Sequence, residues 1–168
     1  MAEISQWFTS QLSSSAEGLA WAARQVSPAR QNQRPPQDLG DWPAVRHVFH
    51  MLFYEQNVAL PGMRQWLGDP LPAIVDENDA WTGSERIETL LPAFTTVRSQ
   101  QIALLTQFKD ADWDRVVETN WGPVTLFWVV SKTYQHTAEH INDVLRIALF
   151  WDYFVTRAER AQGENSVK

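Results

Sequence analysis

The chain has 168 residues, 44% of them hydrophobic, and its 14 basic and 20 acidic side chains give a formal net charge of −6. A chain of this length can bury a sizeable core, so we expect a single domain over residues 1–168. The acidic balance argues against a partner such as nucleic acid or an anionic membrane, which would select a basic surface. Cysteine is absent, which excludes disulfides, Cys-ligated metals and a cysteine nucleophile.

The N-terminal residues show no basic region followed by an apolar stretch, so the sequence predicts no signal peptide. The longest uncharged stretch with apolar character covers residues 119–131. It is far shorter than the roughly 20 residues that a spanning helix needs. We therefore expect a cytoplasmic protein without membrane contacts.

Apolar residues recur at helical spacing over most of the chain, and clusters of Pro and Gly separate the periodic segments. The pattern predicts a first helix over residues 4–25 and a polar connector that ends at Gly40. Asp41 is the predicted N-cap of a second helix over residues 42–67, which stops at Gly68. Residues 71–83 form a long crossover, and Ser84 opens a capping motif before a third helix over residues 85–108.

The period shortens between residues 114 and 125, which indicates a small hairpin or extended arm, although Pro123 weakens the strand pattern. A fourth helix follows over residues 126–148, and a bend near Phe150 and Trp151 is expected to divide off a fifth. The tail over residues 163–168 has the composition of a disordered segment. The predicted fold class is all-α, a four-helix bundle with a long crossover between its second and third helices.

The four histidines fall into two short segments, His47 with His50 on the second helix and His136 with His140 on the fourth. Residues at i and i+4 lie on one helical face, which is a spacing that allows two imidazoles to bind one metal ion. A solvated polar face is the alternative, because Glu139 lies within the second pair. The spacing by itself favours that alternative.

The angular positions of these residues refine the choice. His136 and His140 share a face of mixed polarity, which allows a polar cleft between helices without requiring one. His50 lies at the edge of the apolar stripe of the second helix, whereas His47 points toward the opposite side. Because the side chain of a metal ligand must point into the bundle, we expect His50 to be a third ligand. His47 is expected to be a surface residue that can be replaced without loss of metal.

Two longer motifs resemble the DinB family of helical bundles, which is unrelated to the lesion-bypass polymerase of the same name. Residues 41–52 read Asp-Trp-Pro-Ala-Val-Arg-His-Val-Phe-His-Met-Leu, in which Trp42 opens the helix and His50 follows eight residues later. Residues 122–141 contain an extended arm followed by a His-x-x-x-His helix. The resemblance extends from the first helix to Phe150, but Asn142 and Asp143 depart from the residues frequent in relatives.

The resemblance implies a four-helix bundle that holds a divalent metal ion through His50, His136 and His140. Imidazole binds zinc, nickel, iron and copper alike, so the ligand type does not select the metal. We expect zinc or nickel, with iron or manganese as alternatives. Glu55, Glu139 and Asp143 are candidates for orienting an imidazole. The alternative for each of these three carboxylates is a solvated surface position.

Three neutral imidazoles leave a metal ion its full charge and an open coordination position, which is the arrangement of a catalytic site. Family members of known activity include S-transferases that use bacillithiol and a mycothiol-dependent maleylpyruvate isomerase. The resemblance therefore implies a metal-dependent enzyme that joins a low-molecular-weight thiol to a small-molecule electrophile. A metal-dependent hydrolase is the other enzyme considered, and a non-catalytic metal-binding bundle that acts in stress response or interaction is the second hypothesis. An apolar cleft leading to the metal would favour the enzyme.

The chain contains nine Trp residues, most of which are expected to fill space between helices. Trp66, Trp81 and Trp151 are the ones expected to remain on the surface after the core is filled. Large exposed aromatic side chains are typical of interfaces. The sequence therefore predicts a homodimer.

Overall fold

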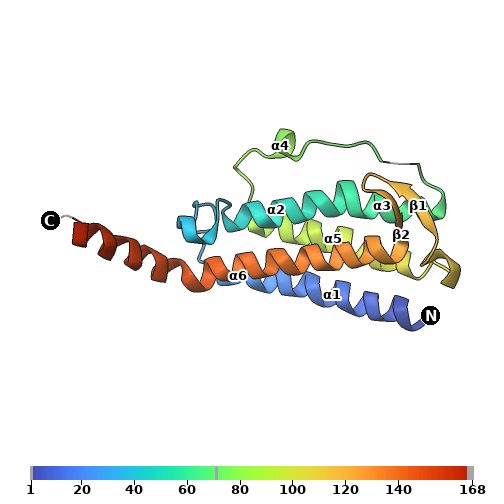
Figure 1. Ribbon diagram of the computed structural model, residues 1–168, viewed down its shortest axis with the longest axis horizontal. Coiled ribbons are helices and arrows are strands. Elements are labelled where there is room, and N and C mark those ends of the chain that lie inside the picture. The colour runs from blue at the N-terminus through green and yellow to red at the C-terminus, as the bar shows by residue number, and fades with distance from the viewer. Residues whose placement is uncertain (1, 71, 166–168) are drawn as a thin grey trace.

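The computed structural model describes residues 2–70 and 72–165. Four helical segments lie along one another and form the bundle in Figure 1. The bundle is built from α1 (Ala2–Gln25), α2 (Ala44–Tyr54) with its continuation to residue 67, α5 (Ile87–Leu105) and α6 (Leu126–Asn165). The predicted all-α four-helix bundle is confirmed. Its short elements are η1 (Gln37–Leu39), α4 (Glu77–Ala80), η4 (Asp110–Asp112) and a hairpin.

The order of the helices in space explains the long crossover. Both α1 and α2 pack against α5 and against α6, whereas α1 and α2 touch each other little and lie on a diagonal. In Figure 1, α2 and α5 run in the same direction. The chain must therefore return along the bundle, which it does through residues 68–86. An extended chain of that length reaches up to roughly 60 Å, and a helix over residues 44–67 is about 36 Å long.

The second helical segment begins and ends close to the predicted residues. It ends before Gly68, whose φ of 99° suits glycine and closes the helix. Its start differs from the prediction, because α2 begins at Ala44 and Asp41 does not cap it. The Asp41 carboxylate instead pairs with Arg34 in the connector.

The middle of this segment is widened into a π-helix, η2 (Glu55–Ala59), before α3 (Leu60–Arg64) and η3 (Gln65–Leu67) continue it. Pro61 supplies the physical reason. It has no amide hydrogen, and its ring clashes with the carbonyl four residues earlier, at Asn57. The prediction of a regular helix over residues 42–67 overlooked this proline.

The third helix, α5, is shorter than predicted at both ends. The expected cap at Ser84 does not form, because the N-cap position is Arg86, which makes no side-chain capping bond. Glu85 accepts a hydrogen bond from the amide of Thr82 instead. The predicted arm is confirmed as the hairpin of β1 (Val116–Thr119) and β2 (Gly122–Thr125), which pair antiparallel. Gly122, at φ 86°, closes its turn.

Two predictions for the C-terminal part of the chain differ from the structure. No fifth helix is divided off near Phe150, because α6 continues as one helix to Asn165 and extends beyond the other three (Figure 1). The tail predicted to be disordered begins at residue 163, but residues 163–165 are helical and 166–168 lie outside the described residues. Trp151 is buried and packs against the core, which anchors the helix past the predicted bend.

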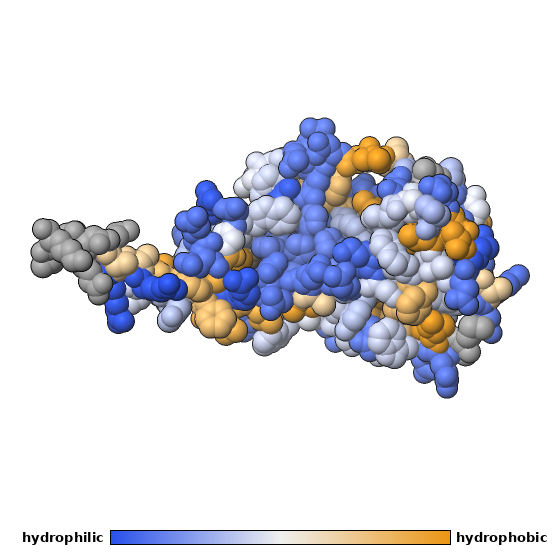
Figure 2. Space-filling model, viewed as in Figure 1, coloured by the Kyte–Doolittle hydropathy of each residue, from blue (hydrophilic) through white to orange (hydrophobic). Residues whose placement is uncertain are grey.

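The core joins all four helices, and α1 packs tightly against α6 at Gly18. A β-carbon there would lie 3.1 Å from Cδ1 of Ile141, so only glycine fits without displacing that side chain. None of the helices in the described part of the chain is both long and apolar enough to cross a membrane. Figure 2 shows a band of hydrophilic residues that runs from α4 across the face between α2 and α6.

Candidate metal centre

The structure brings His50, His136 and His140 together between α2 and α6. His50 comes from α2, and the two other histidines lie one turn apart on α6. Nε2 of His136 lies 3.1 Å from Nε2 of His50 and 3.2 Å from Nε2 of His140. One ligand atom from each of the three residues lies within 4.8 Å of the others. These are the three positions that the sequence and its family resemblance single out.

His47 does not lie on the surface, which corrects the expectation from its angular position. Its side chain is 7% exposed, and its Nδ1 lies 2.9 Å from Nδ1 of His140. The connector explains the difference, because Trp42 covers His47 with a ring contact of 5.4 Å between centroids. A helical wheel of α2 cannot show that the connector and α6 close over this side of the helix.

Glu77 is the carboxylate that contacts a histidine of the cluster, and the sequence analysis did not single it out. It belongs to the short helix α4 in the crossover, and its Oε2 lies 2.5 Å from Nδ1 of His50. Its Oε1 lies 2.9 Å from Nη2 of Arg46. The acidic run at residues 76–79 was the available signal, but nothing in the sequence says where a crossover docks.

Trp42 covers the histidine cluster from the connector side. Its ring stacks on that of His140 at an interplanar angle of 7° and lies 5.1 Å from the ring of His50. The guanidinium of Arg46, on α2, lies 5.2 Å from the centroid of the Trp42 ring. The tryptophan that opens the family-like motif thus shields part of the cluster from solvent.

Burial keeps His47, His136 and His140 neutral at pH 7. Desolvation lowers the pKa of His47 and of His136 to about 4, and that of His140 to about 2. Neighbouring imidazoles lower these pKa values further, because a second positive charge so close is unfavourable. Neutral imidazole is the form that binds a metal ion. His136 and His140 therefore offer their nitrogen lone pairs at neutral pH.

The geometry fits a metal ion held by three nitrogens. Nitrogens about 2.0–2.1 Å from a tetrahedral ion lie about 3.3 Å apart, close to the observed 3.1 and 3.2 Å. A carboxylate only accepts hydrogen bonds, so the proton of a neutral His50 lies on Nδ1, facing Glu77, and its Nε2 is free to bind. Nδ1 of His136 is buried and has no hydrogen-bond partner among the described residues.

The three carboxylates proposed from the sequence take different positions. Glu55, in the π-helix, is fully buried and 2.6 Å from Nη2 of Arg98, so it is neither a solvated residue nor a contact of a clustered histidine. Burial raises the pKa of Glu55, and Arg98 opposes that rise. Glu139 is exposed and pairs with Gln135. Asp143 is half-buried and lies with His47 and His140 in a second cluster of ligand-type side chains.

A pocket of about 580 Å³ borders the cluster on the side of His47 and His140. Its volume is in the range of small-molecule sites. Trp42 and Leu39 supply apolar surface, but Asp38, Asp143 and Arg146 make much of its lining polar. The apolar cleft expected for an enzyme is therefore present only as a pocket of mixed polarity.

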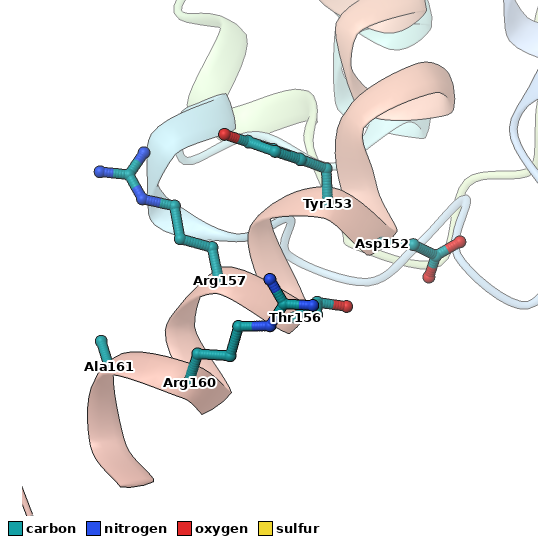
Figure 3. Close-up of a pocket in the computed structure, with 6 residues that line it drawn as sticks. All are labelled: Asp152, Tyr153, Thr156, Arg157, Arg160 and Ala161. Atoms are coloured by element: carbon teal, nitrogen blue, oxygen red, sulfur yellow. The ribbon is translucent and has the colours of Figure 1, made fainter. Parts of the chain in front are cut away.

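A second hollow lies on the extension of α6 and contains none of the four histidines (Figure 3). Its lining comes from a single helix: Asp152, Tyr153, Thr156, Arg157, Arg160 and Ala161. Such a surface lacks the convergence of several elements that a binding site requires. The candidate site is therefore the histidine cluster and the pocket beside it.

The comparisons with known proteins agree with this fold and with the family motifs. The structure is similar to YfiT from Bacillus subtilis, with a TM-score of 0.75, 17% identity, and coverage of 88% of this chain and 87% of that one. YfiT is described as a probable metal-dependent hydrolase with an unusual four-helix bundle topology. None of the curated proteins matches the chain. The family model of the DinB superfamily matches residues 11–144, which contain all four histidines, and the chain belongs to that superfamily.

Proposed function

We propose that this protein is a divalent-metal-dependent enzyme whose metal ion is held by His50, His136 and His140. The observation that carries the proposal is the convergence of three Nε2 atoms, with separations of 3.1 and 3.2 Å from His136. Burial lowers the pKa of His136 and His140, so these two ligands do not have to lose protons near pH 7 to bind the ion. Zinc and nickel are the first candidates for the ion.

The protein supplies orientation and an enclosed surface at this site. Glu77 and His47 contact the outer nitrogens of His50 and His140, which holds both rings with Nε2 toward the centre. Trp42 covers one side and leaves the neighbouring pocket open. A divalent ion bound by three imidazoles keeps its charge and an open position, so it activates a bound water or thiol as a nucleophile.

The proposed reaction is transfer of a low-molecular-weight thiol to an electrophilic small molecule. The chain has no cysteine, so the sulfur nucleophile arrives as a cosubstrate. The pocket of about 580 Å³ contains charged side chains of both signs, including Asp143 and Arg146. This lining favours a polar cosubstrate over an apolar one.

Hydrolysis is the second candidate, and the likeness to YfiT is the observation that favours it. That protein is described as a probable metal-dependent hydrolase. The two reactions require the same side chains and differ in whether water or a thiol acts as nucleophile. They can therefore be separated only by offering both types of substrate to the same preparation.

The test begins with metal analysis of untagged protein, which we expect to show about one divalent ion per chain. The metal-free and reloaded forms are then assayed with several cellular thiols and a haloarene or epoxide, and in parallel with a panel of activated esters and amides. His136→Ala is the inactive comparison, and Glu139→Gln is the control because Glu139 is an exposed carboxylate on the same helix.

Metal-dependent turnover by the wild type, absent from His136→Ala, supports the enzyme, and the productive substrate class identifies the reaction. Equal rates for the two proteins would refute the proposed site. Bound metal without turnover on either panel would favour the non-catalytic metal-binding bundle.

A further inference from the structure

The crossover between α2 and α5 contributes a side chain to the histidine cluster. Residues 72–86, which we call the strap, run along the outside of the bundle, and α4 is the one helical turn within them (Figure 1). Most side chains of this strap are exposed, but Glu77 is only 17% exposed and reaches Nδ1 of His50. Nδ1 of the proposed ligand His50 is therefore held by a side chain that lies outside the four helices.

Arg46 holds Glu77 in this position. The guanidinium, 9% exposed, forms an ion pair with the Glu77 carboxylate and a hydrogen bond with Asn78, the next residue of α4. Three aromatic rings surround it: Trp42 and Phe49 at 5.2 Å from Cζ, and Trp81 at 4.7 Å. Such cation–π contacts are strongest where water is excluded.

The strap is also attached at each end. On one side, Trp81 packs against Phe49 of α2, with 5.0 Å between ring centroids. On the other, Asn120 in the hairpin turn donates a hydrogen bond to the carbonyl of Pro72. These contacts place α4 over α2, the helix that carries His50.

We propose that Glu77 is a positioning residue for the metal ligand His50, and that docking of the strap and metal binding are therefore coupled. The proposal rests on the metal site argued above. A neutral imidazole in water carries its proton mainly on Nε2, which blocks the nitrogen that points toward His136. By accepting a hydrogen bond from Nδ1–H, Glu77 holds the opposite tautomer and leaves Nε2 free.

The coupling follows from thermodynamic linkage. If a docked strap raises the affinity of His50 for the metal ion, a bound ion must favour the docked strap by the same factor. The strap has few buried side chains of its own, so its docking depends on the contacts of Glu77, Arg46 and Trp81. Metal binding at the cluster should thus be measurable as protection of residues 72–86.

The first experiment measures zinc affinity by competition with a chromophoric chelator. It also records the absorption spectrum of the cobalt-loaded protein. Glu77→Ala is expected to weaken zinc binding about 10–100-fold, and Glu77→Gln less, because its amide oxygen still accepts the bond. The cobalt spectrum should change in Glu77→Ala, since His50 is no longer oriented. Asp79→Asn is the matched control, an exposed carboxylate two residues away on α4, and should bind zinc as the wild type does.

Two further measurements separate positioning from a general loss of structure. In the metal-free wild type, nitrogen NMR should show His50 as the Nδ1–H tautomer, and Glu77→Ala should shift it toward Nε2–H. Hydrogen exchange of residues 72–86 should slow on addition of zinc in the wild type and in Asp79→Asn. Glu77→Ala should lose most of this protection while retaining protected amides in α5.

Wild-type zinc affinity and an unchanged cobalt spectrum in Glu77→Ala would overturn this inference while leaving the proposed metal enzyme intact. Detection of the Nε2–H tautomer of His50 in the wild type would do the same. A wild-type protein that binds neither zinc nor cobalt would overturn the proposed function, and the coupling with it.

Discussion

At the scale of single residues, the site depends on which nitrogen each imidazole presents. His50 faces Glu77 through Nδ1, and His140 faces His47 through the equivalent atom. Both rings therefore direct Nε2 toward His136. The spacing and the family motif identify the three inner rings, but not the two residues behind them, because those contacts link separate helices and the crossover.

His47 should matter for metal affinity, contrary to what its angular position predicts. When His140 binds the ion through Nε2, its Nδ1–H donates to Nδ1 of His47, 2.9 Å away. We therefore expect His47→Ala to weaken zinc binding about 10-fold, whereas His50→Ala abolishes it. Calorimetric titration of zinc into the metal-free variants measures both effects. Glu139→Gln should titrate as the wild type does, and unaltered affinity in His47→Ala would contradict the assignment.

The lowered histidine pKa values predict that the metal-free protein loses stability in mild acid. His47 and His136 titrate at about 4 in the folded state and His140 at about 2, against about 6.5 when unfolded. Below pH 6.5 the unfolded chain binds protons that the folded chain does not, so its free energy falls relative to the folded state. Stability therefore rises with pH from about 4 to 6.5 through His47 and His136 and from about 2 to 6.5 through His140, and is complete above that window.

Urea unfolding in a chelator should show a loss of about 2–5 kcal/mol between pH 7 and pH 5. His136→Gln removes one of the three groups, so its loss should be smaller by about 1–2 kcal/mol. The same pH dependence in both proteins would mean that His136 is not held neutral by the fold.

At the scale of elements, the π-helix after α2 places a charged side chain in the core. Glu55, the first residue of η2, is fully buried, as is Arg98 of α5, its partner at 2.6 Å. Arg98 also donates to Thr137 on α6, beside His136, and to Ser15 on α1. One guanidinium thus connects all four helices next to the candidate site.

Removing Arg98 should destabilise the bundle strongly, because Glu55 would remain buried without its partner. Arg98→Met is expected to lower the free energy of unfolding by about 3–5 kcal/mol, as measured in urea at pH 7. The double variant Glu55→Gln/Arg98→Met should recover part of that loss, since no charge is left in the core. A single variant as stable as the wild type would show that the pair is not needed.

At the scale of the whole molecule, the parallel direction of α2 and α5 has a functional consequence. It requires a crossover that runs the length of the bundle, and this crossover brings Glu77 to His50.

The oligomeric state is a second property of the whole molecule. Trp66 and Trp151 are buried and Trp81 is half-buried, so these residues cannot form the aromatic interface expected from the sequence.

The predicted homodimer would have to use another aromatic surface. Trp7 and Phe127, 52% and 47% exposed, line a hollow between α1 and the start of α6. Exposed aromatic clusters of this kind are typical of interfaces. We expect sedimentation velocity at micromolar concentration to show a dimer that Trp7→Glu converts to a monomer, with Trp21→Glu as the exposed-tryptophan control. A monomeric wild type would exclude the dimer.

By itself the sequence determined the four helices, the hairpin, the family and the three histidines that converge, because each depends on local periodicity, on turn residues or on a short motif. Tertiary structure alone decided that His47 is buried, that Glu77 faces His50 and that Glu55 lies in the core beside Arg98. These depend on how the connector and the crossover close over the helices and on a helix widened before Pro61. Such contacts join residues 27 to 93 positions apart, and no local pattern encodes them.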